Sequence, residues 1–362
     1  MEHQNPHRMI VPPQQPANAV TVVADPGDLW GAPPPMYRIS ALDVQDEGHL
    51  IACSATFYHR RGPLHVTWKS RQVGVEEGLL VRPRGGPRAA PGAFEHQISR
   101  PSVLARPEPD VDLFETVPPS WGVPVDLLDR ASALFARLPR AYRHLFNALV
   151  WDAGRFQRFC QWPGSLGNHH KRAGGLLEHT VDAAEIAWSL CQRNPKANAE
   201  LTLLATLVHD LGKTDDYVWN PRGYWYASNR CRLIGHGVTI VEWIAVAAAV
   251  PGVALSQEAY EALVHLLTAR DNAPSWLGIR RSAMIEGEIL SHADRVSGRG
   301  DLHARLAAPG GGWGTRHPHR GSQPYTLPER SEQSPIQGRP PCSSDVPHRY
   351  RYRQARFNGI GD

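Results

Sequence analysis

Hydrophobic residues recur along the chain with two different periods. Between residues 36 and 85, apolar residues alternate with polar or smaller ones in two runs, Ile51 to Phe57 and Leu64 to Trp68. The turn sequence Arg60-Arg61-Gly62-Pro63 separates the runs. A period of two is typical of strands that bury one face, so a small β unit is predicted at residues 36–85.

From residue 123 to 305 a helical period replaces the alternation. Leu127, Ala131 and Leu134 lie on one face of a helix, and Ser256 and Ser282 are expected N-caps. Further helices are predicted at residues 174–191, 201–211, 235–249, 256–269 and 282–296. The expected fold class is therefore mainly α, a helical bundle preceded by a small β unit.

Three segments lack either period. Residues 1–35 are rich in Pro, Gln and Asn, and residues 86–122 and 306–362 are rich in Gly, Pro and Arg, in a chain with 32 Gly and 32 Pro. Such compositions are typical of segments without a packed core. We expect a disordered arm at 1–35, a linker at 86–122 and a disordered basic tail at 306–362.

Composition sets broad limits on function. The net charge of +4 and the pI of about 8.9 permit a polyanionic partner without requiring one. The five cysteines form no CxxC pair, so a reducing, cytoplasmic location is expected. The longest apolar run, Ile240 to Val253, is too short for a membrane span, so no membrane partner is expected.

Four polar residues occupy positions where these helices should be apolar. They lie in the segments GGLLEHT, LLATLVHDLGK and EGEILSHADRVSG and are His179, His209, Asp210 and Asp294. A buried carboxylate without compensation is costly, whereas a divalent cation compensates it and also accepts imidazole ligands. The pattern predicts a metal centre built from these four side chains.

Adjacent residues on one helix point about 100° apart. His209 and Asp210 can nevertheless share an ion that sits beside the helix end, which Gly212 places nearby. A divalent ion in this formally neutral site has positions left for water and a phosphate oxygen, and would lower the pKa of that water. Lys213 could offset charge on the phosphate.

The stretch from His169 to Ser297 resembles the HD superfamily of metal-dependent phosphohydrolases. NHHKRAGGLLEHT, VHDLGKTDDY, RLIGHG and EGEILSHADRVSG are similar to the YhaM-type 3′–5′ exoribonucleases. The resemblance implies an HD-domain bundle, an OB-like barrel for the β unit, and single-stranded RNA or DNA as partner. It also implies a divalent metal cofactor (Mn²⁺, Mg²⁺, Fe²⁺, Co²⁺ or Ni²⁺).

Carried over by position, the resemblance assigns roles to individual residues. The metal ligands are His179, His209, Asp210 and Asp294, and catalytic roles fall to Asp210, Lys213, His236 and His265. His236 matches a histidine of two-metal members and His265 one on the next helix. His169 and His170 match a pair before the two glycines and would contact substrate phosphate or metal-bound water, although a polar loop pair is an equal alternative.

One family motif is missing. Where the family has two histidines in an SHHG-like segment, this chain has Thr268-Ala269-Arg270-Asp271-Asn272. The sequence therefore does not decide whether a second ion binds or whether nuclease activity is complete. Asp271 is an alternative oxygen ligand for a second ion. His292, Glu286 and Glu288 are expected on a solvated helix face.

Basic and aromatic residues mix in the β unit. Trp68, Lys69 and Arg71 are candidates for substrate binding, because rings stack on bases while cations follow the backbone. An ordinary β domain with an aromatic core explains the same residues equally well. The arginine-rich tail is likewise interpreted either as a nucleic-acid contact or as a solvated tail without a partner.

Three function classes follow. The first is a metal-dependent phosphodiesterase or 3′–5′ exonuclease acting on single-stranded nucleic acid, with a phosphohydrolase for free nucleotides as a related activity. The second is a DNA-processing protein of a conjugative or integrating element, because HD-type relaxase domains called TraI or MobH share the HH…GGLLxHT…HDxGK arrangement. The third is a catalytically impaired module that binds metal and nucleic acid.

Overall fold

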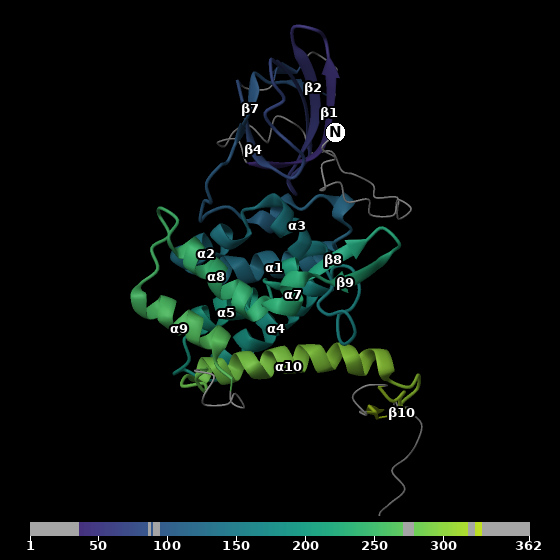
Figure 1. The fold of residues 1–362 in the computed structure, drawn as a ribbon, viewed down its shortest axis with the longest axis vertical. Coiled ribbons are helices and arrows are strands. Elements are labelled where there is room, and N and C mark those ends of the chain that lie inside the picture. Colours follow the sequence, from purple (N-terminus) through teal and green to yellow (C-terminus); the bar gives the residue numbers. More distant parts are fainter. Residues whose placement is uncertain (1–35, 86–87, 90–94, 271–278, 318–322, 328–362) are drawn as a thin grey trace, which may run out of the picture. The chain divides into compact units, whose positions relative to one another are not determined.

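The computed structural model describes residues 36–85, 88–89, 95–270, 279–317 and 323–327. The chain divides into two compact units, residues 1–305 and 306–362. In the first unit a β sheet precedes a helical bundle, which confirms the expected fold class (Figure 1). Within the described ranges, no helix has both the length and the apolar character needed to cross a bilayer.

The sheet is curled, and a two-residue connection joins a strand near one edge to the strand at the opposite edge. Its order is β5-β6-β3-β2-β1-β4-β7. β6 pairs in parallel with β3 and β7 pairs antiparallel with β4, and only Ile98 and Ser99 separate β6 from β7. The strands span Tyr37–Asp46 (β1), Ile51–Tyr58 (β2), Leu64–Ser70 (β3), Leu80–Arg84 (β4), Arg88–Ala89 (β5), His96–Gln97 (β6) and Arg100–Val103 (β7).

The predicted alternation decides which side chains fill this sheet. Cys53 and Phe57 from β2, and Leu64, Val66 and Trp68 from β3, are all buried in one apolar cluster. The residues between them are more exposed. Burial of one face therefore fixes the register of both strands.

Residues 86–122, predicted as a linker, are more ordered than expected where the structure describes them. They contain β6, β7 and two short 3-10 helices, Leu113–Thr116 (η1) and Pro119–Trp121 (η2). Leu113, Phe114 and Val117 are buried in the core of the helical bundle. Prolines interrupt the alternation in this segment, so its contacts leave no periodic signal in the sequence.

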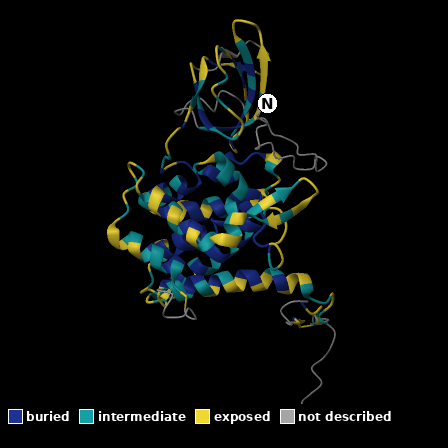
Figure 2. Ribbon diagram, in the orientation of Figure 1, coloured by how far each residue is buried: buried dark blue, intermediate teal, exposed yellow. Residues whose placement is uncertain are grey.

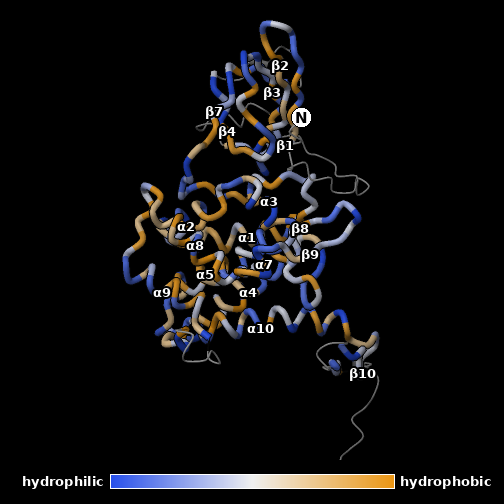
Figure 3. Tube along the Cα trace, viewed as in Figure 1, coloured by the Kyte–Doolittle hydropathy of each residue, from blue (hydrophilic) through white to orange (hydrophobic). Residues whose placement is uncertain are grey.

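The helical bundle is built around α5, a helix that is buried on all sides from Leu201 onward. Every residue from Leu201 to Val208 is buried, and the hydroxyls of Thr202 and Thr206 donate to backbone carbonyls one turn earlier. Figures 2 and 3 show buried and hydrophobic positions concentrated among the helices around it. The helices span Val125–Arg137 (α1), Arg140–Val150 (α2), Ala153–Gln161 (α3), Gly175–Gln192 (α4), Ala199–Val208 (α5), Lys213–Asp216 (α6), Asn229–Leu233 (α7), His236–Ala248 (α8), Gln257–Thr268 (α9) and Ile285–Leu306 (α10).

The N-cap predicted at Ser256 is confirmed, whereas the helix predicted to begin at Ser282 has different bounds. Ser256 accepts a hydrogen bond from the Ala259 amide as the N-cap of α9. Ser282 lies before α10, which begins at Ile285 and continues past the predicted Val296 to Leu306. The second half of α10 is mostly polar and exposed, so hydrophobic periodicity does not mark where it ends.

The second unit has little regular structure in its described part. Gly312–Trp313 (β10) pairs with Tyr325–Thr326 (β11), and the rings of Trp313 and Tyr325 are 5.2 Å apart. Residues 328–362, which carry most of the predicted basic tail, lie outside the described residues, as does the predicted arm at 1–35.

A buried arginine connects the β sheet to the helices. Arg38 of β1 is only 1 % exposed, and its guanidinium donates to Thr116 Oγ1 (3.2 Å) and to the Gly78 carbonyl (2.7 Å). It also lies over the rings of Trp121 and Phe156 at 5.2 and 4.8 Å. Burial lowers the pKa of Arg38 to about 10, so its partners must offset the cost of burying the charge.

We expect Arg38→Met to lower the free energy of unfolding by about 2–3 kcal/mol, because it removes buried hydrogen bonds of a charged group. Urea denaturation followed by tryptophan fluorescence measures the loss. The control is Arg71→Met, which changes an exposed side chain just after β3 and should shift stability by less than about 0.5 kcal/mol. Equal stability of the two variants would contradict the role of Arg38.

Candidate metal centre

The four predicted ligands converge from three separate segments. His179 lies on α4, His209 and Asp210 follow α5, and Asp294 lies on α10. Nε2 of His179 is 3.1 Å from Asp294 Oδ1 and 3.4 Å from Asp210 Oδ2. Nε2 of His209 is 3.5 Å from Asp210 Oδ2 and 3.9 Å from Asp294 Oδ1.

The end of α5 explains how neighbouring residues face one point. The helix ends at Val208, His209 is its C-cap, and Asp210 already belongs to the following turn. His209 keeps helical backbone angles (φ −55°, ψ −37°), so the two side chains still diverge at the backbone, but beside the helix end their tips come within 3.5 Å of each other.

Hydrogen bonds at the far side of each ring orient the two imidazoles. Nδ1 of His209 is 2.7 Å from the Thr206 carbonyl, which can only accept, so Nδ1 carries the proton and Nε2 keeps a free lone pair. Nδ1 of His179 is 3.0 Å from Ser297 Oγ. Both Nε2 atoms are buried and have no hydrogen-bond partner. Unpartnered buried nitrogens beside two carboxylates fit a divalent cation.

The charges of this cluster are strongly coupled. Burial alone would lower the pKa of His179, but the carboxylates of Asp210 and Asp294 raise it to about 9. Burial favours neutral acids, yet Lys213 and His209 hold the pKa of Asp210 well below its usual range. The pKa of Asp294 is also lowered, against burial, by the close approach of both imidazoles to its carboxylate. In the metal-free protein, a proton on His179 thus supplies part of the charge that a cation would supply.

Lys213 is buried against Asp210. Its Nζ lies 2.5 Å from Asp210 Oδ2 and 2.8 Å from the Gly164 carbonyl. The ammonium group is therefore held on the carboxylate that faces both imidazoles.

His236 reaches the cluster through an acid that sequence reasoning missed. Its backbone N–H and its Nδ1 lie 3.2 and 3.0 Å from Oδ2 of the buried Asp216, and its Nε2 lies 3.6 Å from Asp210 Oδ1. Asp216 thus fixes the ring so that Nε2 faces the centre. The one available signal was a second acid in KTDD, whose neighbour Asp215 pairs with Arg158 instead.

Two glycines let backbone segments approach this centre closely. A Cβ on Gly212 would lie 2.5 Å from the His236 carbonyl oxygen, and one on Gly175 would lie 2.0 Å from the His170 carbonyl oxygen. Any larger residue would push these histidine-bearing segments away. Close packing against backbone atoms therefore explains why glycine occupies both positions, in HDLGK and in the GG pair.

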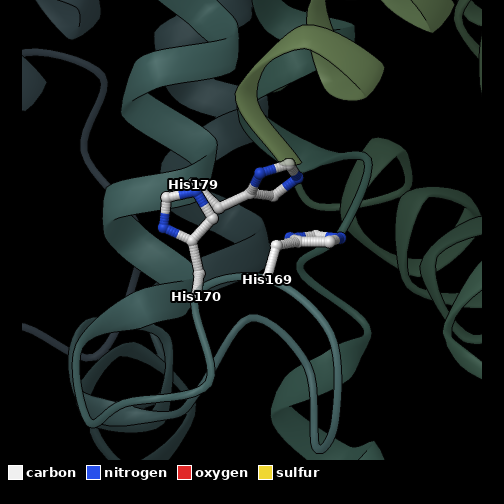
Figure 4. Close-up of side chains that lie close together, drawn as sticks. All are labelled: His169, His170 and His179. Atoms are coloured by element: carbon white, nitrogen blue, oxygen red, sulfur yellow. The ribbon is translucent and has the colours of Figure 1, made fainter. Parts of the chain in front are cut away.

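His169 and His170 form a second group of imidazoles around His179. Their rings lie 4.9 and 5.3 Å from the His179 ring, and Figure 4 shows the three gathered where the loop meets α4. One nitrogen of each lies within 4.8 Å of the others. Burial, and then the charge of His179, lower the pKa of His169 to about 4.

The loop of His170 is held by Asp301, a second residue that sequence reasoning missed. Asp301 on α10 accepts from the His170 amide at 2.7 Å, and His170 has φ 47°, in the left-handed region. This region is unfavourable for a side chain other than glycine. Asp301 lies 131 positions further along the chain, so only the fold brings the two together.

Some candidates do not join the centre. Nε2 of His265 accepts a hydrogen bond from the Ala283 amide at 3.0 Å, before the start of α10, and no ion pair among the described residues joins it to the ligands. Asp271 and Asn272 lie outside the described residues. His292 is exposed as expected, but Glu286 is only 6 % exposed because it accepts from the Asn198 amide at the start of α5.

Of the three substrate-binding candidates in the β unit, one is buried and two are exposed. Trp68 is 2 % exposed and packs against Phe57 in the core, so it cannot stack on a base as predicted. Its position on the inward face of β3 is the physical reason. Lys69 is exposed and pairs with Glu47 at 2.6 Å, and Arg71 is exposed.

Comparison with known proteins agrees with this geometry. Residues 176–299 match the family model described as "HD domain". The chain is 29 % identical over 143 residues to the 3′-5′ exoribonuclease YhaM of Geobacillus sp. (strain WCH70), and 28 % identical over 168 residues to that of Bacillus pumilus (strain SAFR-032). These matches cover 40 % and 46 % of this chain. They confirm the resemblance to HD phosphohydrolases and to YhaM.

The chain spans about half the length of the curated relatives it matches, 43 % and 50 % of the two proteins. No solved structure matches it significantly. The HD domain and the relatives together support a metal-dependent hydrolase.

We expect Gly212→Ala to weaken Mn²⁺ binding and lower stability, because the new methyl group meets the His236 backbone. Gly237→Ala is the matched control, since a Cβ there meets nothing within 4 Å and alanine is favoured in a helix. Mn²⁺ titration calorimetry and thermal unfolding compare the two. Unchanged Mn²⁺ affinity in both variants would contradict the packing role of Gly212.

We expect the Mn²⁺ affinity of the metal-free protein to rise with pH. Because the pKa of His179 is about 9 without metal and a ligand must be deprotonated, binding at neutral pH releases a proton. Below that pKa the apparent affinity should gain about tenfold per pH unit, and above it the gain should stop. Calorimetry in two buffers of different protonation enthalpy counts the protons. Binding at pH 7 without proton release would contradict the assignment.

Proposed function

We propose that this chain is a metal-dependent phosphodiesterase of the HD type that removes nucleotides from the 3′ end of single-stranded nucleic acid. The observation that carries the proposal is the pair of buried, unpartnered Nε2 atoms of His179 and His209 facing two carboxylates. Similarity to proteins named 3′-5′ exoribonuclease favours RNA as the natural strand.

The donor set indicates which cofactor fits. Two imidazoles and two carboxylates suit Mn²⁺, Fe²⁺, Co²⁺ or Ni²⁺, with Mg²⁺ favoured less by the imidazoles. A divalent ion bound there would activate a water molecule and neutralise charge on the phosphate.

Lys213 and Asp216 act on the centre by positioning other groups. Lys213 holds Asp210 in one orientation from a buried site, and its charge stabilises that carboxylate in the ionised form. Asp216 keeps the proton of His236 on Nδ1, so that Nε2 is free to face the substrate side.

His236 is the ring best placed to meet an incoming phosphate. The His236 side chain is 40 % exposed, whereas those of His179 and His209 are 0 % and 12 % exposed. It lies beside Asp210 rather than between the two carboxylates. We assign it contact with a phosphate oxygen of the scissile group.

The β sheet is proposed to hold the strand beyond the site. Its small, curled form is compatible with an OB-like module, a fold that binds oligonucleotides. Lys69 and Arg71 remain exposed for backbone contact.

We expect the purified protein with Mn²⁺ to shorten 5′-labelled single-stranded RNA from its 3′ end. Asp210→Ala should lower the rate by at least about 100-fold, since loss even of an outer partner of a metal ligand costs about 10–100-fold. Asp110→Ala is the matched control, because that aspartate is exposed and pairs only with arginines of α2. Gel analysis of the products gives rate and direction.

Single-stranded DNA, a circular strand and free nucleotides extend this assay. Cleavage of the circle would contradict an end-dependent enzyme and favour the DNA-processing class. Bound metal with no turnover on any substrate would favour a binding module. Equal rates for wild type and Asp210→Ala would reject the proposed centre.

A further inference from the structure

A hairpin rich in aromatic residues directly follows α6, the short helix after His209 and Asp210. It consists of Tyr217–Asn220 (β8) and Tyr224–Ala227 (β9). Five of the residues from 217 to 226 are aromatic, and residues 217–241 contain three arginines and no Asp or Glu. The ligand set does not account for this composition, and the core of the bundle takes up Tyr217 and Trp225 but leaves Tyr224 and Tyr226 exposed.

The two faces of the hairpin differ. On one face, the Trp225 ring lies 4.8 Å from Trp219 and 4.5 Å from Trp162, which fixes the hairpin to the bundle. On the other face, Tyr224 and Tyr226 are 49 % and 40 % exposed, with ring centroids 6.4 Å apart. Figure 1 shows the hairpin projecting beside α7, and Figure 2 shows its tip exposed.

Both ends of the hairpin are attached next to the metal centre. The Tyr217 carbonyl accepts from Trp162 Nε1 at 2.9 Å, and the Ser228 amide donates to the Asp216 carbonyl at 2.8 Å. Asp216 is the same residue whose carboxylate orients His236. The hairpin therefore cannot move far without disturbing the site.

The charge around the exposed tyrosines suits one class of ligand. Arg222 lies in the turn between the strands and Arg232 follows on α7, and both are exposed. Exposed tyrosines with arginines close in the sequence, and with no acid between residues 217 and 241, suit a single-strand binding surface, where bases stack on rings and cations follow the phosphates. Exposed aromatic rings of this kind would otherwise be an unfavourable surface.

We propose that Tyr224 and Tyr226 form a base-stacking platform for the single-stranded nucleic acid whose backbone enters the metal centre. The proposal rests on the proposed function and adds the element that holds the strand. It makes the hairpin, rather than the buried Trp68, the aromatic contact with substrate.

The test measures binding and chemistry separately. Affinity for a labelled single strand of about 12 nucleotides is measured by fluorescence anisotropy in EDTA, where the strand is not cleaved. Hydrolysis of bis(p-nitrophenyl) phosphate with Mn²⁺ reports on the metal centre alone, because this diester has no base. The variants are Tyr224→Ala and Tyr226→Ala, with Tyr224→Phe and Tyr226→Phe as ring-retaining controls.

Each alanine variant should weaken oligonucleotide binding by about fivefold or more, and each phenylalanine variant by less than about twofold. Hydrolysis of bis(p-nitrophenyl) phosphate should stay unchanged in all four. An abasic strand should bind the wild-type protein as weakly as the normal strand binds the alanine variants.

Two results would overturn the platform. Wild-type affinity in both alanine variants would show that the rings do not bind bases. Loss of bis(p-nitrophenyl) phosphate hydrolysis in the alanine variants would show that the hairpin shapes the site instead. If the wild-type protein hydrolyses neither substrate, the proposed function fails, while the anisotropy data still decide whether the hairpin binds the strand.

Discussion

The structure depends on the cost of bringing two carboxylates to the same two imidazoles, with the Asp210 side chain buried and the Asp294 side chain half-exposed. Asp210 and Asp294 share the neighbourhood of the same two imidazoles, and both have lowered pKa values despite burial. Lys213 and a proton on His179 offset part of this charge in the metal-free protein. A divalent cation would offset it more completely, and this requirement links the fold to its chemistry.

The surrounding helices and loops position the side chains that meet at the candidate metal centre. α5 is mostly apolar and buried from Leu201 to Val208, so its C-terminal end places His209 and Asp210 in the interior. Gly175 and Gly212 allow backbone segments to approach at distances that a side chain would prevent. The histidines on those segments, His170 and His236, thereby surround the ligands.

A set of hydrogen bonds then fixes the orientation of each ring. Ser297 faces Nδ1 of His179, the Thr206 carbonyl faces Nδ1 of His209, and Asp216 faces Nδ1 of His236. In each case the opposite nitrogen is left for the centre. These partners decide tautomer and direction, which are the properties a metal ligand needs in addition to being present.

The sequence by itself determined the fold class and singled out the candidate ligands, because both leave local signals. Alternation marked the strands that bury Phe57 and Val66, and His179, Asp210 and Asp294 stood out as polar residues in apolar helices. The tertiary structure alone decided the rest. Burial of Trp68, the hydrogen bond from Ala283 to His265, and the packing of residues 95–117 depend on contacts between distant segments. Such contacts have no period in the sequence, because they are set by how the elements pack and not by the pattern within any one of them.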